Sequence, residues 1–250
     1  GISNDIETHQ DDISKKNNVL KLIEGVQPDE IYNLAAQSSV SKSFSHPKET
    51  TNSIVNGSLN ILDASKLIDF TGKLFFAGSS EIFGNTDKAA SIKSIHNPCS
   101  PYGVCKQASL NLVRIYRESF GLKCVTGILF NHESTLRNDN FVTQKIIKSA
   151  IDIKRKKYSK IQLGNLSVVR DWGWAPEYVE AMQLILRDER NEDQIICTGS
   201  KNTLDYFTRK AFEKLDLNWE QHININKDLF RPNEIIQSYG NPEKLFKDLG

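Results

Sequence analysis

A tyrosine and a lysine four positions apart, Tyr102 and Lys106, form the pair of side chains in this sequence best suited to proton transfer. Residues with this spacing on a helix lie on one face, so a helix would bring the phenol and the ammonium close together. A cation beside a tyrosine favours the phenolate, and we expect it to lower the pKa of Tyr102 from its usual value of ~10. The pair therefore predicts a base with a pKa closer to the working pH.

A hydroxyl and a carboxylate precede this pair in the chain. Ser79 and Glu81 follow an apolar run at 74–77 that is typical of a buried strand. Open α/β sheets usually bind their ligands outside the carboxyl ends of the strands, which is where both side chains would lie. Taken alone, Glu81 is more readily interpreted as a solvated turn residue, so its neighbours must decide its role.

The elements that must position these side chains alternate between helices and apolar strands. We predict helices at 19–25, 53–68 and 102–120, and strands at 31–36, 74–77 and 125–130. Gly121 stands where a left-handed C-cap would end the third helix. This alternation predicts the α/β class, with a Rossmann-like, doubly wound and mostly parallel sheet.

The pattern changes after residue 130. Further helices are expected at 142–153, 177–186, 204–215 and 242–249, and short strands at 161–163 and 195–197, with an irregular tail between 218 and 241. We predict a partial Rossmann cofactor-binding domain at 1–130 and a smaller C-terminal α/β substrate domain at 131–250, with about 168–198 returning to the first. No internal repeat or low-complexity tract separates the two.

A glycine-rich turn is missing from the sequence. Dinucleotide-binding sheets begin with a strand and a turn of the form G-x-x-G-x-x-G or G-x-G-x-x-G, whose amides hold the pyrophosphate. The sequence contains no such turn. We therefore expect both ends of the chain to be incomplete and the chain to enter the sheet after its second strand. These 250 residues alone are expected to bind a dinucleotide weakly or not at all.

Composition narrows the range of partners. A net charge of +1 gives no overall field that would favour nucleic acid or an anionic membrane, and no apolar run approaches the length of a membrane span. The one dense cationic run, 154–157, is interpreted as a solvated helix end. The four cysteines have no paired or zinc-like spacing, so reduced thiols and no metal are expected. With no start of signal-peptide type, the sequence predicts a soluble, cytoplasmic protein.

Several segments carry a family resemblance. Tyr102 and Lys106, with Ser79 upstream, resemble the extended short-chain dehydrogenase/reductases that modify nucleotide sugars, although a Y-x-x-x-K spacing alone is weak. Five further segments resemble the GDP-mannose 4,6-dehydratases in particular: IYNLAAQS at 31–38, GILFNHES at 127–134, FVTQKI at 141–146, LGNL at 163–166 and RDWGWA at 170–175. The resemblance runs over about 12–249, nearly the whole chain.

The resemblance implies a reaction and its partners. Members of this family convert GDP-mannose to GDP-4-dehydro-6-deoxy-mannose and water, with transient hydride transfer to NADP. We therefore expect NADP as cofactor, with NAD not excluded because the segment that reads the ribose 2′-phosphate is absent. GDP-mannose is the expected substrate, and a homo-oligomer, dimer or tetramer, is the expected assembly.

The resemblance also gives a role to each of four catalytic residues. Tyr102 would take the proton of the sugar 4-hydroxyl, while Lys106 would lower its pKa and hold a cofactor ribose hydroxyl. Ser79, which stands where the family normally has Thr, would hydrogen-bond the 4-oxygen. Glu81 would remove the C5 proton and assist departure of the C6 hydroxyl, a task that epimerases and simple reductases of this fold do not require.

Other residues match cofactor-binding positions. Those expected around the adenine or at the strand end beneath the cofactor are Asp12, Ile13, Leu34, Ala35, Ala36, Gln37 and Ser38. His132 and Arg137 would approach the cofactor from the loop that follows the third strand; His132 is also consistent with a buried, hydrogen-bonded histidine. The family usually has Pro-Arg-Arg after Ser134, whereas this chain has Thr-Leu-Arg, in a loop that can reach a neighbouring subunit in the family.

Matching positions for the substrate come mostly from the second half of the chain. Those near the sugar and diphosphate are Asn131, Val142 and Lys145, and those around the guanosine and phosphates are Asn165, Arg170 and Arg231. The other expected substrate residues are Ser80, Leu163 and Glu234. Arginine suits a phosphate because its planar fork donates two hydrogen bonds at once. Arg170 beside Asp171 is also consistent with a structural ion pair. Trp172 and Trp174 are interpreted as packing residues.

Two other functions remain open from the sequence. One is an epimerase or 4-keto reductase on the same fold, against which Glu81 and the segment 131–134 count. The other is a truncated, non-catalytic chain that binds a sugar nucleotide. Loss of water from GDP-mannose would distinguish the dehydratase from both.

Overall fold

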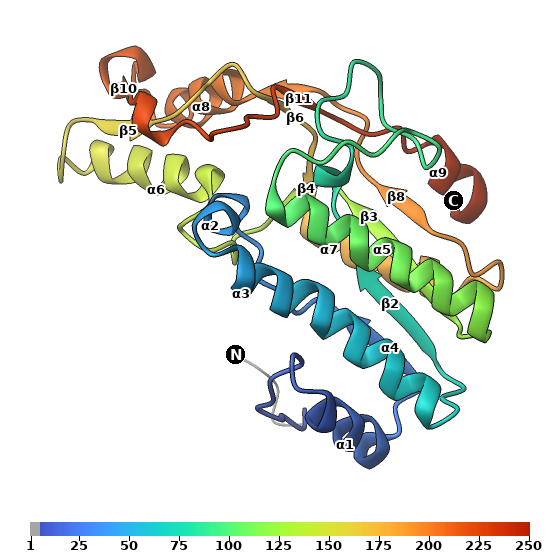
Figure 1. Ribbon diagram of the computed structural model, residues 1–250. Helices are drawn as coiled ribbons and strands as arrows, with labels where there is room; N and C mark the ends of the chain where they lie inside the picture. The colour runs from blue at the N-terminus through green and yellow to red at the C-terminus, as the bar shows by residue number, and fades with distance from the viewer. Residues whose placement is uncertain (1–5) are drawn as a thin grey trace.

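A parallel sheet of four strands forms the centre of the fold (Figure 1). The computed structural model describes residues 6–250. The strands are ordered β1-β2-β3-β8, with β1 at Glu30–Asn33, β2 at Lys73–Ala77, β3 at Cys124–Leu129 and β8 at Gln194–Ile196. Each neighbouring pair is parallel, so the predicted α/β class with a parallel sheet is confirmed.

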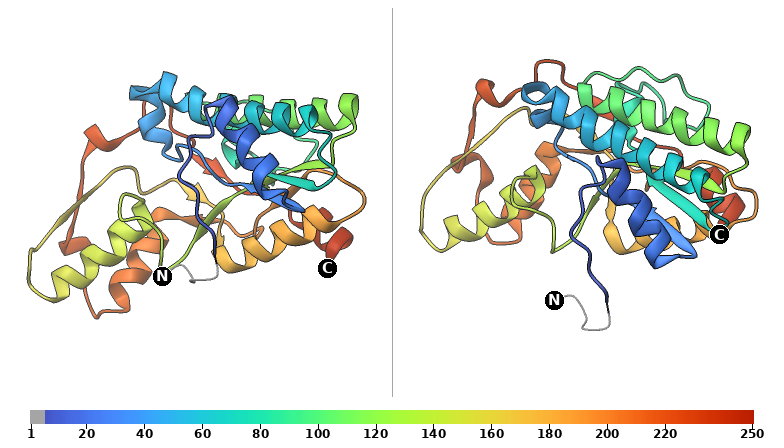
Figure 2. Two further views of the ribbon diagram at one scale, coloured as in Figure 1. Left: turned by 90° about the horizontal axis from the view of Figure 1, so that it is seen from below. Right: turned by 60° about the horizontal axis from the view of Figure 1, so that its bottom comes forward.

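Helices cover both faces of this sheet, and Figure 2 shows α7 on the side opposite α4 and α5. The covering helices are α1 (Lys16–Val26), α4 (Gly57–Leu67), α5 (Pro101–Phe120) and α7 (Ala175–Arg187). Successive side chains of β2 point to opposite faces of the sheet. Leu74 and Phe76 pack with residues of α1 and α4, and Phe75 packs with residues of α7. All of β3 is buried because both of its faces are covered.

The helix α5 begins and ends where its sequence predicts. Ser100 caps it, because its hydroxyl accepts a hydrogen bond from Gly103 N at 3.0 Å, and Pro101 occupies the first turn. Gly121 ends the helix in the left-handed region, with φ of 71°. The start of α5, which carries Tyr102, is therefore fixed by local sequence.

The helix predicted at 53–68 is less regular than expected. A π-helical turn, η1 (Asn52–Asn56), precedes α4, and two short helices precede that turn, α2 (Val40–Ser45) and α3 (Pro47–Thr51). Ile54, in the π-helical turn, packs against Tyr102 and Cys105 of α5. This segment thus forms one wall beside the first turns of α5.

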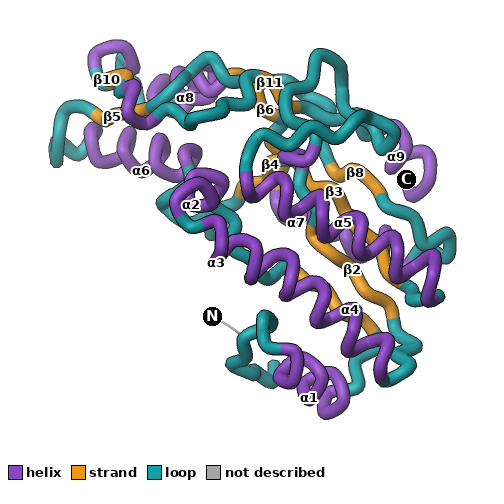
Figure 3. The backbone as a smooth tube through the Cα atoms, in the orientation of Figure 1, coloured by secondary structure: helices purple, strands orange, loops and turns teal. Residues whose placement is uncertain are grey.

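The second half of the chain forms a group of helices and strands beside the main sheet (Figure 3). This group has a hydrophobic core of its own. Ile146, Leu163 and Phe212 are among its buried residues. Its elements are α6 (Val142–Lys154), α8 (Leu204–Glu213), the parallel pair β5 (Ile161–Leu163) and β10 (Ile223–Ile225), and the short helices η3 (Trp219–Gln221) and η4 (Lys227–Leu229). The expectation of an irregular tail from residue 218 is wrong, because pairing with β5 orders part of it.

Short strands connect this group to the main sheet. They are β4 (Asn131–Glu133) paired with β7 (Trp172–Trp174), and β6 (Val169–Arg170) between β11 (Gln237–Ser238) and β9 (Asn202–Thr203). The chain then returns through α7 and β8 to the main sheet and ends with α9 (Glu243–Leu249). The division into domains at residue 130 stays a prediction.

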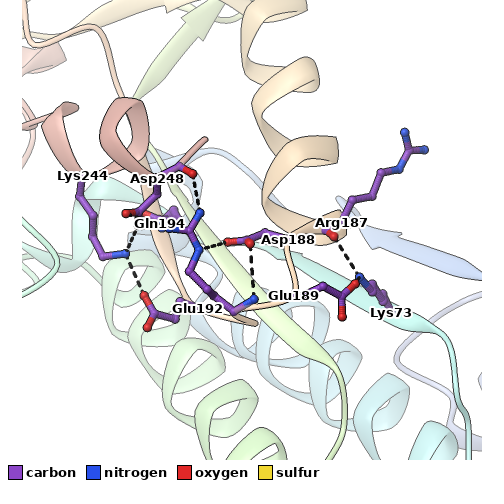
Figure 4. A network of polar contacts seen from close by, with 9 residues as sticks. Lys73, Arg187, Asp188, Glu189, Glu192, Gln194, Lys244 and Asp248 are labelled. Atoms are coloured by element: carbon purple, nitrogen blue, oxygen red, sulfur yellow. Dashed lines mark hydrogen bonds and ion pairs between the residues drawn. The ribbon is translucent and has the colours of Figure 1, made fainter. Parts of the chain in front are cut away.

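Polar contacts fasten α9 to the segment that enters β8 (Figure 4). Gln194 Nε2 donates to Asp248 Oδ2 at 2.9 Å, and Lys244 Nζ lies 2.9 Å from Glu192 Oε2. Exposed ion pairs contribute little one by one, so these contacts act mainly by fixing where the helix docks.

The outer edge of β1 has no paired strand within residues 6–250. In the part of the chain that the structure describes, no helix is both long and apolar enough to cross a bilayer. The same residues contain no group of three or more His, Cys, Asp or Glu arranged to hold a metal ion. All four cysteines are free thiols.

Candidate active site

The first two turns of α5 carry Tyr102 and Lys106 on one buried face. The Lys106 ammonium lies 5.8 Å from the centroid of the Tyr102 ring. It donates a hydrogen bond to the backbone oxygen of Ala77, at the end of β2, at 2.7 Å. The structure therefore has the predicted helix and the predicted proximity of the two side chains.

Burial decides the ionisation of both groups. Loss of hydration raises the pKa of Tyr102 to about 12, although a hydrogen bond with Ser79 acts to lower it. Burial also lowers the pKa of Lys106 to about 8. The expectation that Lys106 lowers the pKa of Tyr102 is therefore wrong for this structure, because the ammonium is itself desolvated and is directed to Ala77 O. An additional positive charge beside the phenol would be needed to lower its pKa.

The turn after β2 presents the serine and the carboxylate. It forms a short 3-10 helix, η2 (Ser80–Ile82), in which the Ser79 hydroxyl accepts a hydrogen bond from Glu81 N at 3.3 Å. This turn packs directly on the start of α5: a Cβ added to Gly103 would lie 2.9 Å from Glu81 O. The absence of a side chain at Gly103 is what lets Ser79, Glu81 and Tyr102 share one site.

Glu81 is a buried carboxyl with arginines beside it. Burial raises its pKa, and the positive charges of Arg231 and Arg170 oppose that shift. Arg231 Nη1 lies 3.8 Å from Glu81 Oε1. A carboxyl with a raised pKa can hold a proton closer to neutral pH, which suits a group that must act as base and then as acid.

Two carboxylates and two arginines form one cluster in this site. Arg170 Nη2 lies 3.6 Å from Glu234 Oε1, and Arg231 Nε lies 4.0 Å from the same oxygen. The structure therefore brings together Glu81 and three of the predicted substrate residues, from segments far apart in the sequence. Arg170 forms its carboxylate contact with Glu234, so the alternative of an ion pair with Asp171 is wrong.

The strand ends of β1 and β2 enclose a cavity beside Lys106. Its lining includes Asn33, Ala35, Ala36 and Thr126. Asn33 Oδ1 and Thr126 Oγ1 are buried without a hydrogen-bond partner. Buried polar atoms of this kind are normally satisfied, and the cavity, about 10 Å³ in volume, has room for about one water molecule between them.

The residues after β1 are only partly directed toward this cavity. Gln37 Nε2 donates to Ser39 O at 2.9 Å and to Thr50 Oγ1 at 3.0 Å, so its amide is engaged within its own turn. Leu34 is half exposed and Ser38 is exposed. Ala35 and Ala36 are the members of this segment that line the cavity.

Asp12 and Ile13 lie beside α4 rather than beside Tyr102. Asp12 is exposed and accepts a hydrogen bond from Ser14 N at 2.9 Å. Ile13 packs against the core cluster under α4, and its backbone oxygen accepts from Asn60 Nδ2 at 2.9 Å. Any role of this pair in holding an adenine stays a prediction.

His132 has the contacts of a buried histidine. Its ring packs against that of Tyr178 with centroids 4.8 Å apart and planes tilted by 30°, and Nδ1 lies 2.9 Å from Phe130 O. Burial lowers its pKa. Arg137 lies over the ring of Phe141, with Cζ 3.5 Å from the centroid. The positive charge of Arg137 acts on Tyr102, which places this loop near the site.

The predicted substrate residues of α6 and β5 form a separate group. Lys145 Nζ donates to Gln162 O at 2.7 Å, and Asn165 Oδ1 accepts from Ser167 N at 2.9 Å. The Leu163 side chain is buried in the core beneath them. Val142 at the start of α6 is exposed, and Asn131 stands on β4.

Asn33 and Thr126 line the small cavity beside Lys106, and sequence analysis does not predict that they lie there. A polar residue within an apolar strand is the one available signal: Asn33 ends β1, and Thr126 lies inside the fully buried β3. Such a residue must find a partner or a ligand, because an unpaired polar group in a core costs free energy. The sequence alone does not tell which of the two applies.

Replacing Lys106 by methionine is expected to stabilise the fold most near neutral pH. The pKa of Lys106 in the folded protein, about 8, lies below the ordinary value of 10.5. Between these two pH values the unfolded chain therefore binds more protons than the folded protein. The free energy of unfolding of the wild-type protein should therefore rise with pH across that window relative to that of Lys106→Met. The extra stability of the variant should shrink by the same amount. Urea denaturation of both proteins at about pH 7 and about pH 10 measures it. Parallel pH profiles would contradict the burial of the charge.

Comparison with solved structures shows the class of fold. The UDP-glucose 4-epimerase of Thermus thermophilus, solved with NAD, gives a TM-score of 0.88 at 22% identity and covers 98% of this chain and 79% of that one. RMD from Pseudomonas aeruginosa, complexed with NADPH, gives a TM-score of 0.87 at 22% identity and covers 97% of this chain and 81% of that one. At this identity the likeness shows the fold alone, which is the Rossmann-like α/β fold predicted from the sequence.

Comparison of sequences identifies the family, which the fold alone does not. The family model described as GDP-mannose 4,6 dehydratase matches residues 1–250. GDP-mannose 4,6 dehydratases 1 and 2 of Arabidopsis thaliana are 39% and 41% identical over 97% of this chain, which covers 68% and 66% of them. This chain belongs to the GDP-mannose 4,6-dehydratase family, which confirms the resemblance, and it spans about two thirds of the length of these relatives.

Proposed function

We propose that this chain carries the catalytic centre of a GDP-mannose 4,6-dehydratase, which forms GDP-4-dehydro-6-deoxy-mannose and water. The observation that carries the proposal is Glu81, a buried carboxyl beside Ser79 and Tyr102. A reaction that only oxidises or inverts C4 needs no second acid–base group at this place. Removal of a proton from C5 and loss of the C6 hydroxyl require one. Membership of the dehydratase family supports the same reaction.

The cofactor that we propose is NADP. A nicotinamide dinucleotide is supported by the position of Lys106 at the carboxyl end of β2, because open α/β sheets bind their ligands outside the carboxyl ends of the strands. The Lys106 ammonium would hold a ribose hydroxyl. When bound, the oxidised cofactor supplies a positive charge and a hydride acceptor for C4, and later the hydride for C6. Solved structures with the same fold contain NAD or NADPH, which supports a dinucleotide of this class.

The residues of the chain then divide the proton transfers between them. Tyr102 accepts the proton of the 4-hydroxyl as C4 becomes a ketone, and the Ser79 hydroxyl donates a hydrogen bond to the 4-oxygen. Glu81 takes the C5 proton; the electrons of the C5–H bond form the C5–C6 double bond as the C6–O bond breaks. Glu81 returns a proton to the departing hydroxyl, which leaves as water. When C6 then receives the hydride, C5 takes up a proton and Tyr102 releases the proton that it accepted, so the net change is the loss of one water.

We propose that the arginines of the cluster bind the diphosphate of the sugar nucleotide. Arg170 and Arg231 are the cations nearest to Glu81, and each also faces Glu234. A phosphate would compete with these carboxylates for the arginines. Loss of the Arg231 contact would let the pKa of Glu81 rise further, because a positive charge beside a carboxyl favours its ionised form.

We also propose a homo-oligomer in the cytoplasm. Val104 and Ile115 of α5 are 54% and 44% exposed, which suits a surface covered by a second copy. The four free cysteines suit a reducing compartment.

The reaction is tested with an extended version of the chain, preceded by a strand for the outer edge of β1 and a glycine-rich turn. Incubated with GDP-mannose and NADP, it should form a product lighter by one water, detected by mass spectrometry. An epimer of GDP-mannose, or unchanged sugar at full NADP occupancy, would overturn the proposed reaction.

A further inference from the structure

Asp171 is a fully buried carboxylate between two short strands. It follows β6, which pairs with β11 and β9, and precedes β7, which pairs with β4. Its exposed fraction is 0%. Within residues 6–250 no lysine, arginine or histidine nitrogen lies within salt-bridge distance of it. A buried charge must be satisfied by hydrogen bonds in such a place.

Backbone and hydroxyl groups supply those bonds. Asp171 Oδ1 accepts from Thr198 N at 2.9 Å and from Thr198 Oγ1 at 2.6 Å. Asp171 Oδ2 accepts from Gly199 N at 2.9 Å and from Gly240 N at 3.4 Å. One carboxylate therefore joins the β6–β7 crossing, the loop after β8, and the chain that follows β11.

The close approach at Gly240 requires glycine. A Cβ there would lie 2.6 Å from Cys197 Sγ and 2.8 Å from Phe130 Cε2. Gly240 ends a segment, residues 231–240, that we call the strap. The strap begins at Arg231 and includes Glu234, so it carries part of the charged cluster of the candidate site.

The strap has further attachments along its length. Asn85 Oδ1 accepts from Ile236 N at 2.6 Å, and Thr86 N donates to Gln237 O at 2.9 Å. These contacts join the strap to the loop after η2, on the same side as Glu81. Asp171 holds the far end of the strap, and its chain neighbour Arg170 contacts Glu234 within the strap.

We propose that Asp171 is a positioning residue for sugar-nucleotide binding: it sets where Arg170 and Arg231 stand relative to each other and to Glu81. This inference rests on the proposed function, since it assigns the two arginines to the diphosphate. Asp171 contacts no reacting group itself. It acts through the strap and through the backbone of its neighbour.

A purely structural carboxylate beside the main sheet provides the control. Asp193, before β8, accepts hydrogen bonds from Thr126 N at 2.7 Å and from the guanidinium of Arg117 at 2.8 and 2.9 Å. It stands at the amino end of β8, whereas Thr198 follows the carboxyl end. Asp193→Asn should therefore reduce stability without altering the strap.

The test compares Asp171→Asn with Asp193→Asn in the 250-residue chain. Titration calorimetry with GDP-mannose, without cofactor, should show affinity lowered by about tenfold or more for Asp171→Asn, the size of one lost charge-assisted hydrogen bond. Asp193→Asn should change affinity by less than about twofold. Hydrogen exchange of amides 231–240 should quicken in Asp171→Asn alone.

Two further variants keep the test decisive. Thr198→Val removes one hydroxyl donor to Asp171, leaves the carboxylate in place, and should weaken GDP-mannose binding in the same direction by about fivefold if Asp171→Asn does not fold. Arg231→Gln should weaken GDP-mannose binding strongly in the wild-type chain and much less in a chain that already carries Asp171→Asn. The two effects should not add, because Asp171 acts by positioning Arg231.

The outcomes separate this inference from the proposed function. If the wild-type chain binds GDP-mannose but Asp171→Asn and Thr198→Val bind equally well, or strap exchange is unchanged, the positioning role is wrong. If the wild-type chain fails to bind GDP-mannose while strap exchange responds to Asp171→Asn, the proposed function fails instead, and with it the substrate assigned to the arginines.

Discussion

Replacement of Glu81 by glutamine is expected to stop the loss of water while sparing oxidation at C4. Glutamine preserves the volume of the side chain but cannot take the C5 proton or protonate the leaving hydroxyl. General acid–base catalysis typically contributes about 10²–10⁴-fold, so formation of the 6-deoxy product should fall by that factor in the extended version. Mass spectrometry of the sugar nucleotide measures the product.

Reduced nicotinamide provides the internal control for Glu81→Gln. In a single turnover it should still form, because Tyr102 and Lys106 remain, and its absorbance reports hydride transfer from C4. If Glu81→Gln loses water from the sugar as fast as the wild-type protein does, the role assigned to this carboxyl is wrong. Loss of hydride transfer together with water loss would show that Glu81 serves the redox step instead.

Replacement of Tyr102 by phenylalanine is expected to stop both steps. Without the phenol oxygen no group accepts the proton of the 4-hydroxyl, so hydride transfer and everything after it should fall by about 10²–10⁴-fold. Absorbance of reduced nicotinamide in a single turnover measures the first step, and mass spectrometry measures the second. This pattern differs from that of Glu81→Gln, in which only the second step is lost.

The fold should tolerate Tyr102→Phe. The ring packs against Ile54 and Cys105, and those contacts remain in the variant. Calorimetric unfolding should show a midpoint close to that of the wild-type protein. Normal hydride transfer with phenylalanine at this position would show that another group removes the 4-hydroxyl proton.

Local sequence is sufficient to predict the elements that carry the catalytic residues. Ser100, Pro101 and Gly121 fix the ends of α5, and the apolar run before Gly78 fixes β2. The proximity of Tyr102 and Lys106 follows from helix geometry alone. These are short-range effects, which a single sequence contains in full.

Ionisation and ion pairing depend on neighbours far apart in the chain. The pKa of Tyr102 is raised because packing removes water from it, which the sequence pattern does not show. Arg170 contacts Glu234 instead of Asp171, since successive side chains of an extended segment point to opposite faces. The contact of Arg231 with Glu81 joins residues 150 positions apart, and only the tertiary fold places them together.

The position of deuterium in the product tests the central claim most directly. GDP-mannose labelled at C4 is incubated with NADP and the extended version, and the product is examined by NMR and mass spectrometry. Oxidation at C4, loss of water across C5 and C6, and return of the same hydride predict a 4-keto sugar that has lost one water and carries the deuterium at C6. A product that retains the C6 hydroxyl, or a 6-deoxy product without deuterium at C6, would contradict the account.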